Sequence, residues 1–368
     1  MQDDKETRQR PEAANARVPF DRRGAHPSAA SDNESIPSGE QVHVRHRGLL
    51  GSVGLGLITG AADDDPSAIG TYASAGAALG PSFLWTAPVT FPMMFAVVYL
   101  SSKLGQVAGE GLFAAIRRHY SKWVLYPALV GVLIGNTIEA GADLGGMAAS
   151  INLLIPIAIV WIVVPVALMI LALQIWGSYA LIRNTFRWLA LSLLAYIASA
   201  ILAKPALWPV IKGTLIPHIQ FNREFLSMLV AVIGTSLSAY LYTWQSNEEV
   251  EEEIAMGRTR LSQRKGATKV ELKQSQRDIL FGMFFSNVVM YFIVLSTAAT
   301  LFSAGKRQIN SAAEAAQALK PLAGNAAGIL FTIGVIAVGF LAVPPDDDDR
   351  PNDEQEVDYG TTREWPRG

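Results

Sequence analysis

The chain has 368 residues, of which 50% are hydrophobic and only 17% are charged, and its mean hydropathy is +0.26. Of its 62 charged residues, 42 lie in 1–47, 247–278 and 344–368, which leaves 20 for the other 264 residues. A soluble domain is about 25% charged and spreads that charge over its surface, so this distribution argues against a soluble protein. The net charge of −2 argues against a nucleic-acid-binding protein. The absence of cysteine excludes disulfides, thiolate metal sites and a cysteine nucleophile.

Residues 1–47 contain Pro, Ser, Arg and acidic residues in no apolar period, and we predict a disordered cytoplasmic tail there. No apolar segment follows the start, so a cleavable signal peptide is not expected. Residues 48–343 form the predicted transmembrane domain, because about 20 apolar residues cross about 30 Å of hydrocarbon. Its eight apolar blocks are Leu49–Gly80, Phe83–Leu100, Val124–Leu154, Ile157–Trp176, Phe186–Ala203, Phe225–Gln245, Ile279–Phe302 and Ala326–Val343. Buried helices of a large soluble protein would need more polar covering than this chain has.

The basic residues of the polar links set the orientation of these spans. With the N-terminus in the cytoplasm, fifteen Lys and Arg residues lie on that side and six on the other. The positive-inside rule therefore predicts a multi-pass protein of the cell membrane with a cytoplasmic N-terminus. Residues 247–278 then form a cytoplasmic loop. We interpret its acidic run, Glu248–Glu253, as a solvated helix face balanced by nearby basic residues rather than as a metal site.

Three consecutive acids, Asp63, Asp64 and Asp65, lie near the centre of the first block. An acid at mid-membrane costs on the order of 2.5–3.5 kcal/mol on insertion scales, so three together need water, a cation or protons. Pro66 follows, and it has no N–H to donate to the carbonyl of Ala62. We therefore predict a broken helix with a free carbonyl at Ala62, an arrangement that transporters use to hold a cation at the midplane. The alternative is a short loop that exposes the acids to water.

The sixth block has small polar residues at its middle, namely Gly234, Thr235, Ser236 and Ser238. Their hydroxyl groups can bond freed carbonyls or offer oxygen ligands, and Gly234 marks a candidate helix break. The other common use of such residues in a span is contact between helices.

Two further acids, Glu139 and Asp143, lie in the third block. They are four residues apart and therefore share one helix face. One interpretation is a proton or ion path beside the site. The other is a pair near a helix end that reaches water.

The stretch Gly60–Ala77, with the sequence GAADDDPSAIGTYASAGA, resembles the first span of the Nramp family of divalent metal transporters, whose hallmark there is Asp-Pro-Gly-Asn. Supporting matches are INLL at Ile151–Leu154 and EEVE at Glu248–Glu251, and the resemblance covers about residues 48–343. It implies an all-α integral membrane protein with a leucine-transporter-type fold of inverted repeats. It also implies discontinuous first and sixth helices, a metal site where they meet, no enzymatic activity, and no cofactor besides the transported ion.

Carried over residue by residue, the resemblance puts the hallmark Asp on Asp65 and a carbonyl ligand on Ala62. The family's Asn falls on Ala68, so that ligand is absent. In the sixth span the family has Met-Pro-His, where this chain has Ser238-Ala-Tyr, and a second carbonyl ligand falls on Thr235.

The loss of the family's thioether ligand changes the expected metal. Thioethers favour soft transition metals, whereas hydroxyl and carboxylate oxygens favour hard ones. The chain is most similar to the Nramp-related branch that lacks this Met, which includes Mg²⁺ transporters. We predict that Asp65 with Asp64 binds a partly hydrated Mg²⁺ or Mn²⁺ in preference to Fe²⁺. Asp63 is a candidate for the ion or proton pathway, and the sequence leaves proton coupling open.

The chain changes abruptly after the eighth block, which is about 18 residues long. Residues 344–368 are a polar acidic tail with 12 charged residues, whereas the family has ten or more spans. We expect a truncated or frame-shifted end, which resequencing of the gene would test. Two other function classes compete: an inactive or sensor protein derived from a transporter, and an intramembrane Mg²⁺-diphosphate enzyme. In an Asp-Asp-x-x-Asp motif of such an enzyme, the third Asp would fall on Ser67. The acids would also lie too deep in the membrane for a headgroup substrate.

Overall fold

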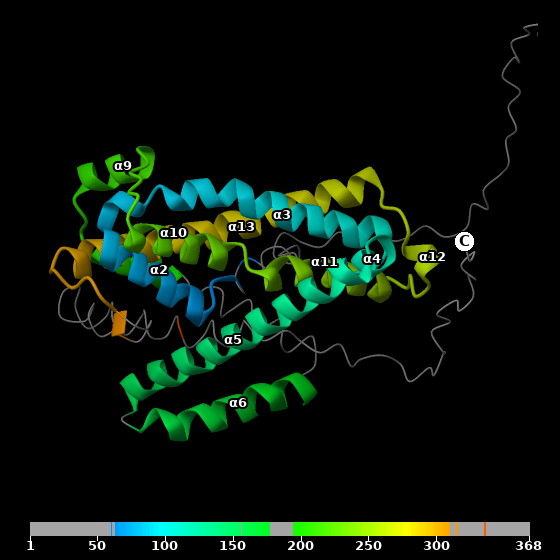
Figure 1. The fold of residues 1–368 in the computed structure, drawn as a ribbon, viewed down its shortest axis with the longest axis horizontal. Coiled ribbons are helices and arrows are strands. Elements are labelled where there is room, and N and C mark those ends of the chain that lie inside the picture. Colours follow the sequence, from blue (N-terminus) through cyan, green and yellow to red (C-terminus); the bar gives the residue numbers. More distant parts are fainter. Residues whose placement is uncertain are drawn as a thin grey trace, which may run out of the picture. The chain divides into compact units, whose positions relative to one another are not determined.

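The computed structural model describes residues 60, 63–155, 157–176, 194–309, 314–315 and 335, and every structural statement here refers to them. The predicted tails 1–47 and 344–368, and nearly all of the eighth block, lie outside the described residues. The regular elements of the described part are all helical, without a strand (Figure 1). The prediction of an all-α protein is therefore confirmed.

The helices follow one another with short links. Their bounds are α2 Pro66–Leu79, η1 Gly80–Phe83, α3 Thr86–Ala108, α4 Leu112–His119, α5 Lys122–Leu154, α6 Ile159–Trp176, α8 Leu194–Leu202, α9 Leu207–Leu215, α10 Arg223–Ser236, α11 Ala239–Ala255, α12 Leu261–Arg264, α13 Lys269–Thr297 and η2 Ala298–Phe302. Within the described residues, four segments are long and apolar enough to cross a membrane: Thr86–Ala108, Lys122–Asn152, Arg223–Ala255 and Lys269–Phe302. They correspond to the predicted second, third, sixth and seventh blocks. The fourth block forms α6, in which Ile159–Ala172 is a shorter apolar helix.

Local sequence explains where several helices begin. The side chain of Asn222 accepts a hydrogen bond from the N–H of Phe225 at 2.8 Å and so caps α10. At the start of α13, Thr268 Oγ1 accepts from the N–H of Glu271, whose carboxylate accepts from the N–H of Thr268. This reciprocal capping box satisfies two amides that have no partner inside the helix.

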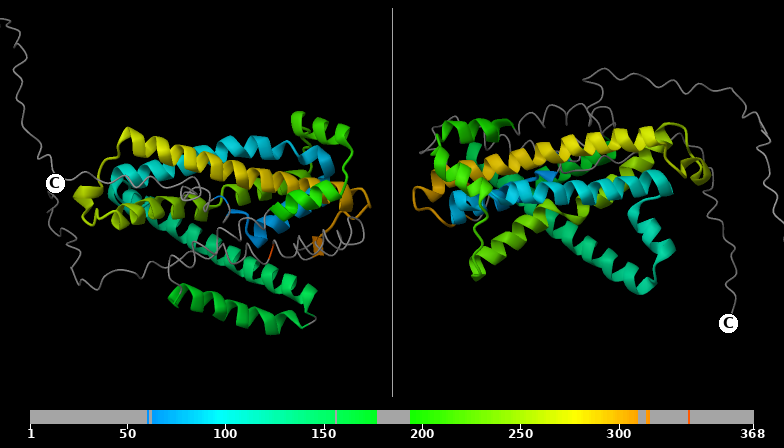
Figure 2. Two further views of the ribbon diagram at one scale, coloured as in Figure 1. Left: turned by 180° about the vertical axis from the view of Figure 1, so that it is seen from behind. Right: turned by 90° about the horizontal axis from the view of Figure 1, so that it is seen from above.

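Helix α13 is the central packing element of the described part. It packs against both α2 and α3, and the views of Figure 2 show it running alongside α3. The largest cluster of buried side chains joins α2, η1, α10 and α13. Within this cluster the rings of Phe83 and Phe225 meet edge to face, with centroids 5.5 Å apart and planes at 82°. This geometry suits the quadrupoles of two aromatic rings.

Helices α5 and α6 pack against each other and present large apolar side chains to the outside. Examples are Leu133 at 60% exposure, Ile138 at 68% and Trp161 at 76%. An apolar surface of this extent is unusual for a protein in water. It is the surface expected of helices that face lipid.

The polar stretch 247–278 is more helical than the predicted loop. Helix α11 continues through Ala255, α12 covers Leu261–Arg264, and α13 already begins at Lys269. Its acids also differ from the predicted solvated face, because Glu248, Glu249 and Glu253 are buried. The reason is tertiary: α11 packs against α3, whose polar side chains supply hydrogen bonds to this face.

Candidate functional site

The first apolar block is interrupted at its acids. Asp63 is the last helical residue before the break, Asp64 and Asp65 are not helical, and Pro66 begins α2. Asp65 has extended backbone angles and caps α2, because its Oδ1 accepts from the N–H of Ala68 at 2.6 Å. Proline is well suited to the first turn of a helix, where its missing N–H would have no partner. The predicted carbonyl ligand, Ala62, lies outside the described residues.

The acids at this break are buried. Asp63 is 4% exposed, Asp64 is 0% exposed and Asp65 is 6% exposed, which overturns the alternative of a loop that opens them to water. Asp63 Oδ2 accepts from the hydroxyl of Ser286 on α13 at 3.0 Å. In the described part of the chain, neither carboxylate oxygen of Asp64 has a hydrogen-bond partner, and Asp63 Oδ1 has none either. A buried carboxylate without a donor is strongly unfavourable unless a cation or a proton compensates it.

Helix α5 brings a further acid to the same break. Asp143 Oδ1 accepts from the backbone N–H of Ser67 at 3.0 Å, so the first turn of α2 is capped by two aspartates. The positive end of the helix dipole favours carboxylates in this position. The carboxyls of Glu139 and Asp143 both lie beside that of Asp65. Asp143 lies well inside α5, so the interpretation of an acid near a helix end is wrong for this residue.

A close backbone approach makes this contact possible. A Cβ atom built on Gly146 would lie 2.9 Å from the Cβ of Pro66. No larger side chain fits there without moving one of the helices. Gly146 therefore allows α5 to pack against the start of α2 one turn after Asp143.

The sixth block is interrupted too, but not at the predicted residue. Helix α10 ends at Ser236 and α11 begins at Ala239, with Ser238 as its cap, whose Oγ accepts from the N–H of Leu241 at 3.4 Å. Gly234 lies inside α10, so the prediction of a break at Gly234 is wrong. A glycine costs a helix only about 1 kcal/mol and removes no hydrogen bond, whereas Ser238 caps a new helix.

Thr235 lies in the last turn of α10 and is partly buried. The carbonyls of a last turn have no amide partner within their own helix. The Thr235 carbonyl therefore belongs to the set of backbone oxygens that this break leaves available.

The two interrupted helices are joined next to the breaks by Ser236, one of the small polar residues noted in the sixth block, and by Tyr72 and Met290, which the sequence did not single out. The hydroxyl of Tyr72 on α2 lies 3.1 Å from Ser236 Oγ on α10, and both side chains are buried. Ser236 Oγ also donates to the sulfur of Met290 on α13 at 3.7 Å. Ser286 and Met290, one turn apart on α13, thus contact the first and the sixth span respectively. The polar pair Ser286-Asn287 inside the seventh apolar block was the signal that could have indicated this face.

The site offers oxygen atoms as ligands for a cation, but carboxylates alone do not form a complete metal site in the described residues. Across 63–155, 157–176 and the other described ranges, no group of three Asp, Glu or His side chains is arranged to hold a metal ion. A cation here would therefore need backbone, hydroxyl or water oxygens beside the aspartates. Such all-oxygen sites suit hard divalent cations, which often keep several waters.

Most of the chain is similar in sequence to known proteins. Residues 56–345 match the family described as Nramp, natural resistance-associated macrophage protein-like. The divalent metal cation transporter MntH of Klebsiella pneumoniae strain 342 is 26% identical over 318 residues, which is 85% of this chain and 72% of that protein. The MntH proteins of Aeromonas hydrophila and Pectobacterium carotovorum are 26% and 25% identical over 279 residues, covering 75% of this chain and 66% and 65% of theirs.

Proposed function

We propose that this chain, which belongs to the Nramp family, carries divalent metal cations across a membrane and binds them between the interruptions of its first and sixth spans. The relatives that it matches are named divalent metal cation transporters, which speaks against the enzyme alternative. The observation that carries the proposal is Asp64, a fully buried carboxylate directly at a helix break, neither oxygen of which has a hydrogen-bond partner among the residues that the structure describes.

Asp65 and Asp64 have different roles in the proposed site. Asp65 uses Oδ1 to cap α2, which fixes its carboxylate at the helix break, where it can bind the cation. Asp64 offers both oxygens, and Thr235 and Ser238 supply a carbonyl and a hydroxyl from the sixth span. Because two anionic ligands with water suffice for Mg²⁺, this set binds a partly hydrated ion.

Ligand hardness sets the preferred metal. Carboxylate, carbonyl and hydroxyl oxygens favour Mg²⁺ and Mn²⁺ over softer transition metals. Fe²⁺ is therefore the weaker substrate in this proposal. The thioether of Met290 contacts Ser236 rather than any of the proposed ligands.

The remaining acids form the path to the site. Asp143 and Glu139 lie beside Asp65 and continue the line of acids from the site along α5. Asp63, which contacts Ser286, extends this acidic row to α13. Metal binding displaces protons from such groups, so protons leave along this row. The distribution of Lys and Arg supports a plasma-membrane location with the N-terminus and the 247–278 stretch on the cytoplasmic side.

Uptake by the full chain reconstituted in liposomes tests the proposal. Wild type should accumulate Mn²⁺ and Mg²⁺ faster than Fe²⁺, and Asp65→Asn should lower the initial rate at least about tenfold, because a buried ligand charge is lost. Glu224→Gln, a change at an exposed residue in the first turn of α10, is the matched control and should leave uptake unchanged. Equal uptake by Asp65→Asn and wild type would overturn the assigned site, and binding without uptake would favour a sensor.

A further inference from the structure

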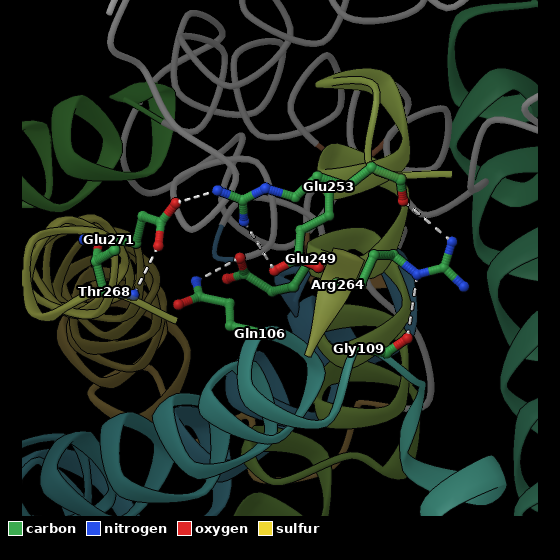
Figure 3. Close-up of polar contacts among 8 residues, drawn as sticks. Gln106, Gly109, Glu249, Glu253, Arg264, Thr268 and Glu271 are labelled. Atoms are coloured by element: carbon green, nitrogen blue, oxygen red, sulfur yellow. Dashed lines mark hydrogen bonds and ion pairs between the residues drawn. The ribbon is translucent and has the colours of Figure 1, made fainter. Parts of the chain in front are cut away.

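A buried carboxylate lies far along the sixth span from the proposed site. Glu249 is only 5% exposed, yet its contacts in the described part of the chain include no cation. Its Oε1 accepts from the hydroxyls of Ser102 and Ser275 at 2.6 and 2.9 Å and from Gln245 Nε2 at 2.9 Å. Its Oε2 accepts from Gln106 Nε2 at 2.6 Å (Figure 3). Four neutral donors thus converge on one carboxylate.

These donors come from three helices. Ser102 and Gln106 belong to α3, Gln245 and Glu249 itself to α11, and Ser275 to α13. The two serine hydroxyls lie 2.7 Å apart, so α3 and α13 meet at the carboxylate oxygen that both hydroxyls contact. Glu249 is therefore the shared acceptor that connects all three helices.

The backbones of α3 and α11 are closely packed beside Glu249. A Cβ on Gly105 of α3 would lie 2.5 Å from the carbonyl oxygen of Ser246 on α11 and 3.1 Å from the Cβ of Glu249. One turn earlier, Ser101 Oγ donates to the carbonyl of Tyr242. The glycine lets α3 and α11 approach until the Gln106 amide reaches the carboxylate.

A second layer of charged contacts surrounds this network. Arg258 forms ion pairs with Glu253 at 3.6 Å and with Glu271 at 2.7 Å, and so joins the end of α11 to the start of α13. The hydrogen bond to Glu271 raises the pKa of the Arg258 guanidinium. Arg264 Nε donates to the carbonyl of Gly109, which follows the end of α3 (Figure 3). These cations pair with Glu253 and Glu271 and bind a backbone carbonyl, and in the described part of the chain Glu249 is contacted by the neutral donors instead.

The consequence for the site follows from the geometry of α11. This helix begins at the Ser238 cap and contains Glu249 eleven residues later, about 16 Å away at 1.5 Å per residue. Because the helix is continuous, a shift at Glu249 also moves Ser238. The break at Leu237 separates α11 from α10, so α10 does not hold Ser238 in the same way. The location of Ser238 is therefore fixed from the other end of α11.

We propose that Glu249 is a positioning residue of the cation site, which holds α11 against α3 and α13 so that Ser238 and the second helix break face the aspartates of the first. The inference rests on the proposed transport function and adds a remote residue to it. When the network is broken, α11 occupies its binding-competent position for a smaller fraction of the time. The apparent affinity falls by that fraction, while the chemistry of the site stays the same.

An exchange of donor and acceptor tests this directly. Mn²⁺ uptake at varied concentration is measured in liposomes for wild type, Glu249→Gln, Gln106→Glu and the double variant. Glu249→Gln removes the charge and puts an NH2 donor where a carboxylate oxygen accepted, and Gln106→Glu sets two carboxylates against each other. In both cases KM should rise about tenfold, the scale of one hydrogen bond to a charged group. The double variant restores one carboxylate and its amide partner, and its KM should return to within about threefold of wild type. The maximum rate per folded transporter should stay within about twofold throughout, because the site's own ligands are intact.

A purely structural role would instead lower the amount of folded protein and the maximum rate with KM unchanged, and that result would overturn the inference. Failure of the double variant to recover KM would do the same. If Glu249→Gln does not fold, Ser275→Ala removes a single donor and should raise KM by a smaller factor, about threefold. Mn²⁺ titration of the same proteins in detergent separates the two proposals. A wild type that binds without transport contradicts the proposed function, and the Kd of the variants then decides the role of Glu249.

Discussion

The backbone N–H of Ser67 donates a 3.0 Å hydrogen bond to the carboxylate of Asp143, which lies 76 residues further along the chain. This contact attaches the middle of α5 to the first turn of α2, immediately beside the capping carboxylate of Asp65. Two helices that are distant in sequence therefore share the acidic centre of the described fold. The chemistry of the proposed site depends on this attachment as much as on the aspartates of the first span.

Substitutions at Asp143 should separate capping from ion conduction. Asp143→Asn keeps an oxygen that accepts from Ser67 but removes the charge, whereas Asp143→Ala removes both. We expect the Ala variant to lose about 1.5–3 kcal/mol of stability, the usual value of a hydrogen bond to a charged group, and the Asn variant to lose less. Thermal unfolding in detergent measures the difference. Uptake should fall in both, and normal uptake by Asp143→Asn would remove this residue from the ion path.

The approach of α5 to α2 should be sensitive to one methyl group. Gly146→Ala places a Cβ 2.9 Å from that of Pro66, and overpacking of this kind costs about 1–3 kcal/mol. Gly135→Ala is the matched control on the same helix, because nothing lies within 4 Å of its Cβ position. We expect slower Mn²⁺ uptake and a lower unfolding temperature for Gly146→Ala only. Equal behaviour of the two variants would show that α5 does not need this contact.

The cap of α11 offers a further test. Ser238→Ala removes the hydroxyl that accepts from Leu241, and loss of such a cap costs about 1 kcal/mol. Ser238→Asn keeps a capping oxygen and should retain stability. If the hydroxyl also binds the cation, Ser238→Ala should raise the KM for Mn²⁺, because no oxygen ligand remains on this side chain. A KM at the wild-type value in this variant would restrict Ser238 to capping.

Apolar length and local turn chemistry account for what the sequence predicted well. The block Val124–Leu154 differs from α5 by two residues at its start, because the apolar run follows a polar link and stops just before Pro156, whose preceding residue is disfavoured in a helix. The break at Asp65-Pro66 was readable because an Asp cap followed by proline is a strong helix start. Membership of the Nramp family, expected from the same residues, is confirmed.

What the sequence could not predict depends on contacts between distant segments. Glu249 was predicted to lie on a solvated acidic face. It is buried instead, and one of its hydrogen-bond donors is Ser102, which lies 147 residues earlier in the chain. The sixth break was assigned to Gly234 because glycine is the most visible local signal, whereas the cap at Ser238 decides where α11 begins. Asp143 could be placed on a helix face from its spacing, but its partner on α2 follows only from how the helices pack.

The most direct test of the cation site is a calorimetric titration of Mn²⁺ into the purified full chain and its Asp64→Asn variant. Asp64 is fully buried, and within the described residues neither of its carboxylate oxygens has a hydrogen-bond partner. We predict saturable binding by wild type and an affinity at least about tenfold weaker in the variant, since a charged ligand is replaced by a neutral one. The same Kd for both proteins would contradict the central claim that the acids at the first helix break bind the transported ion.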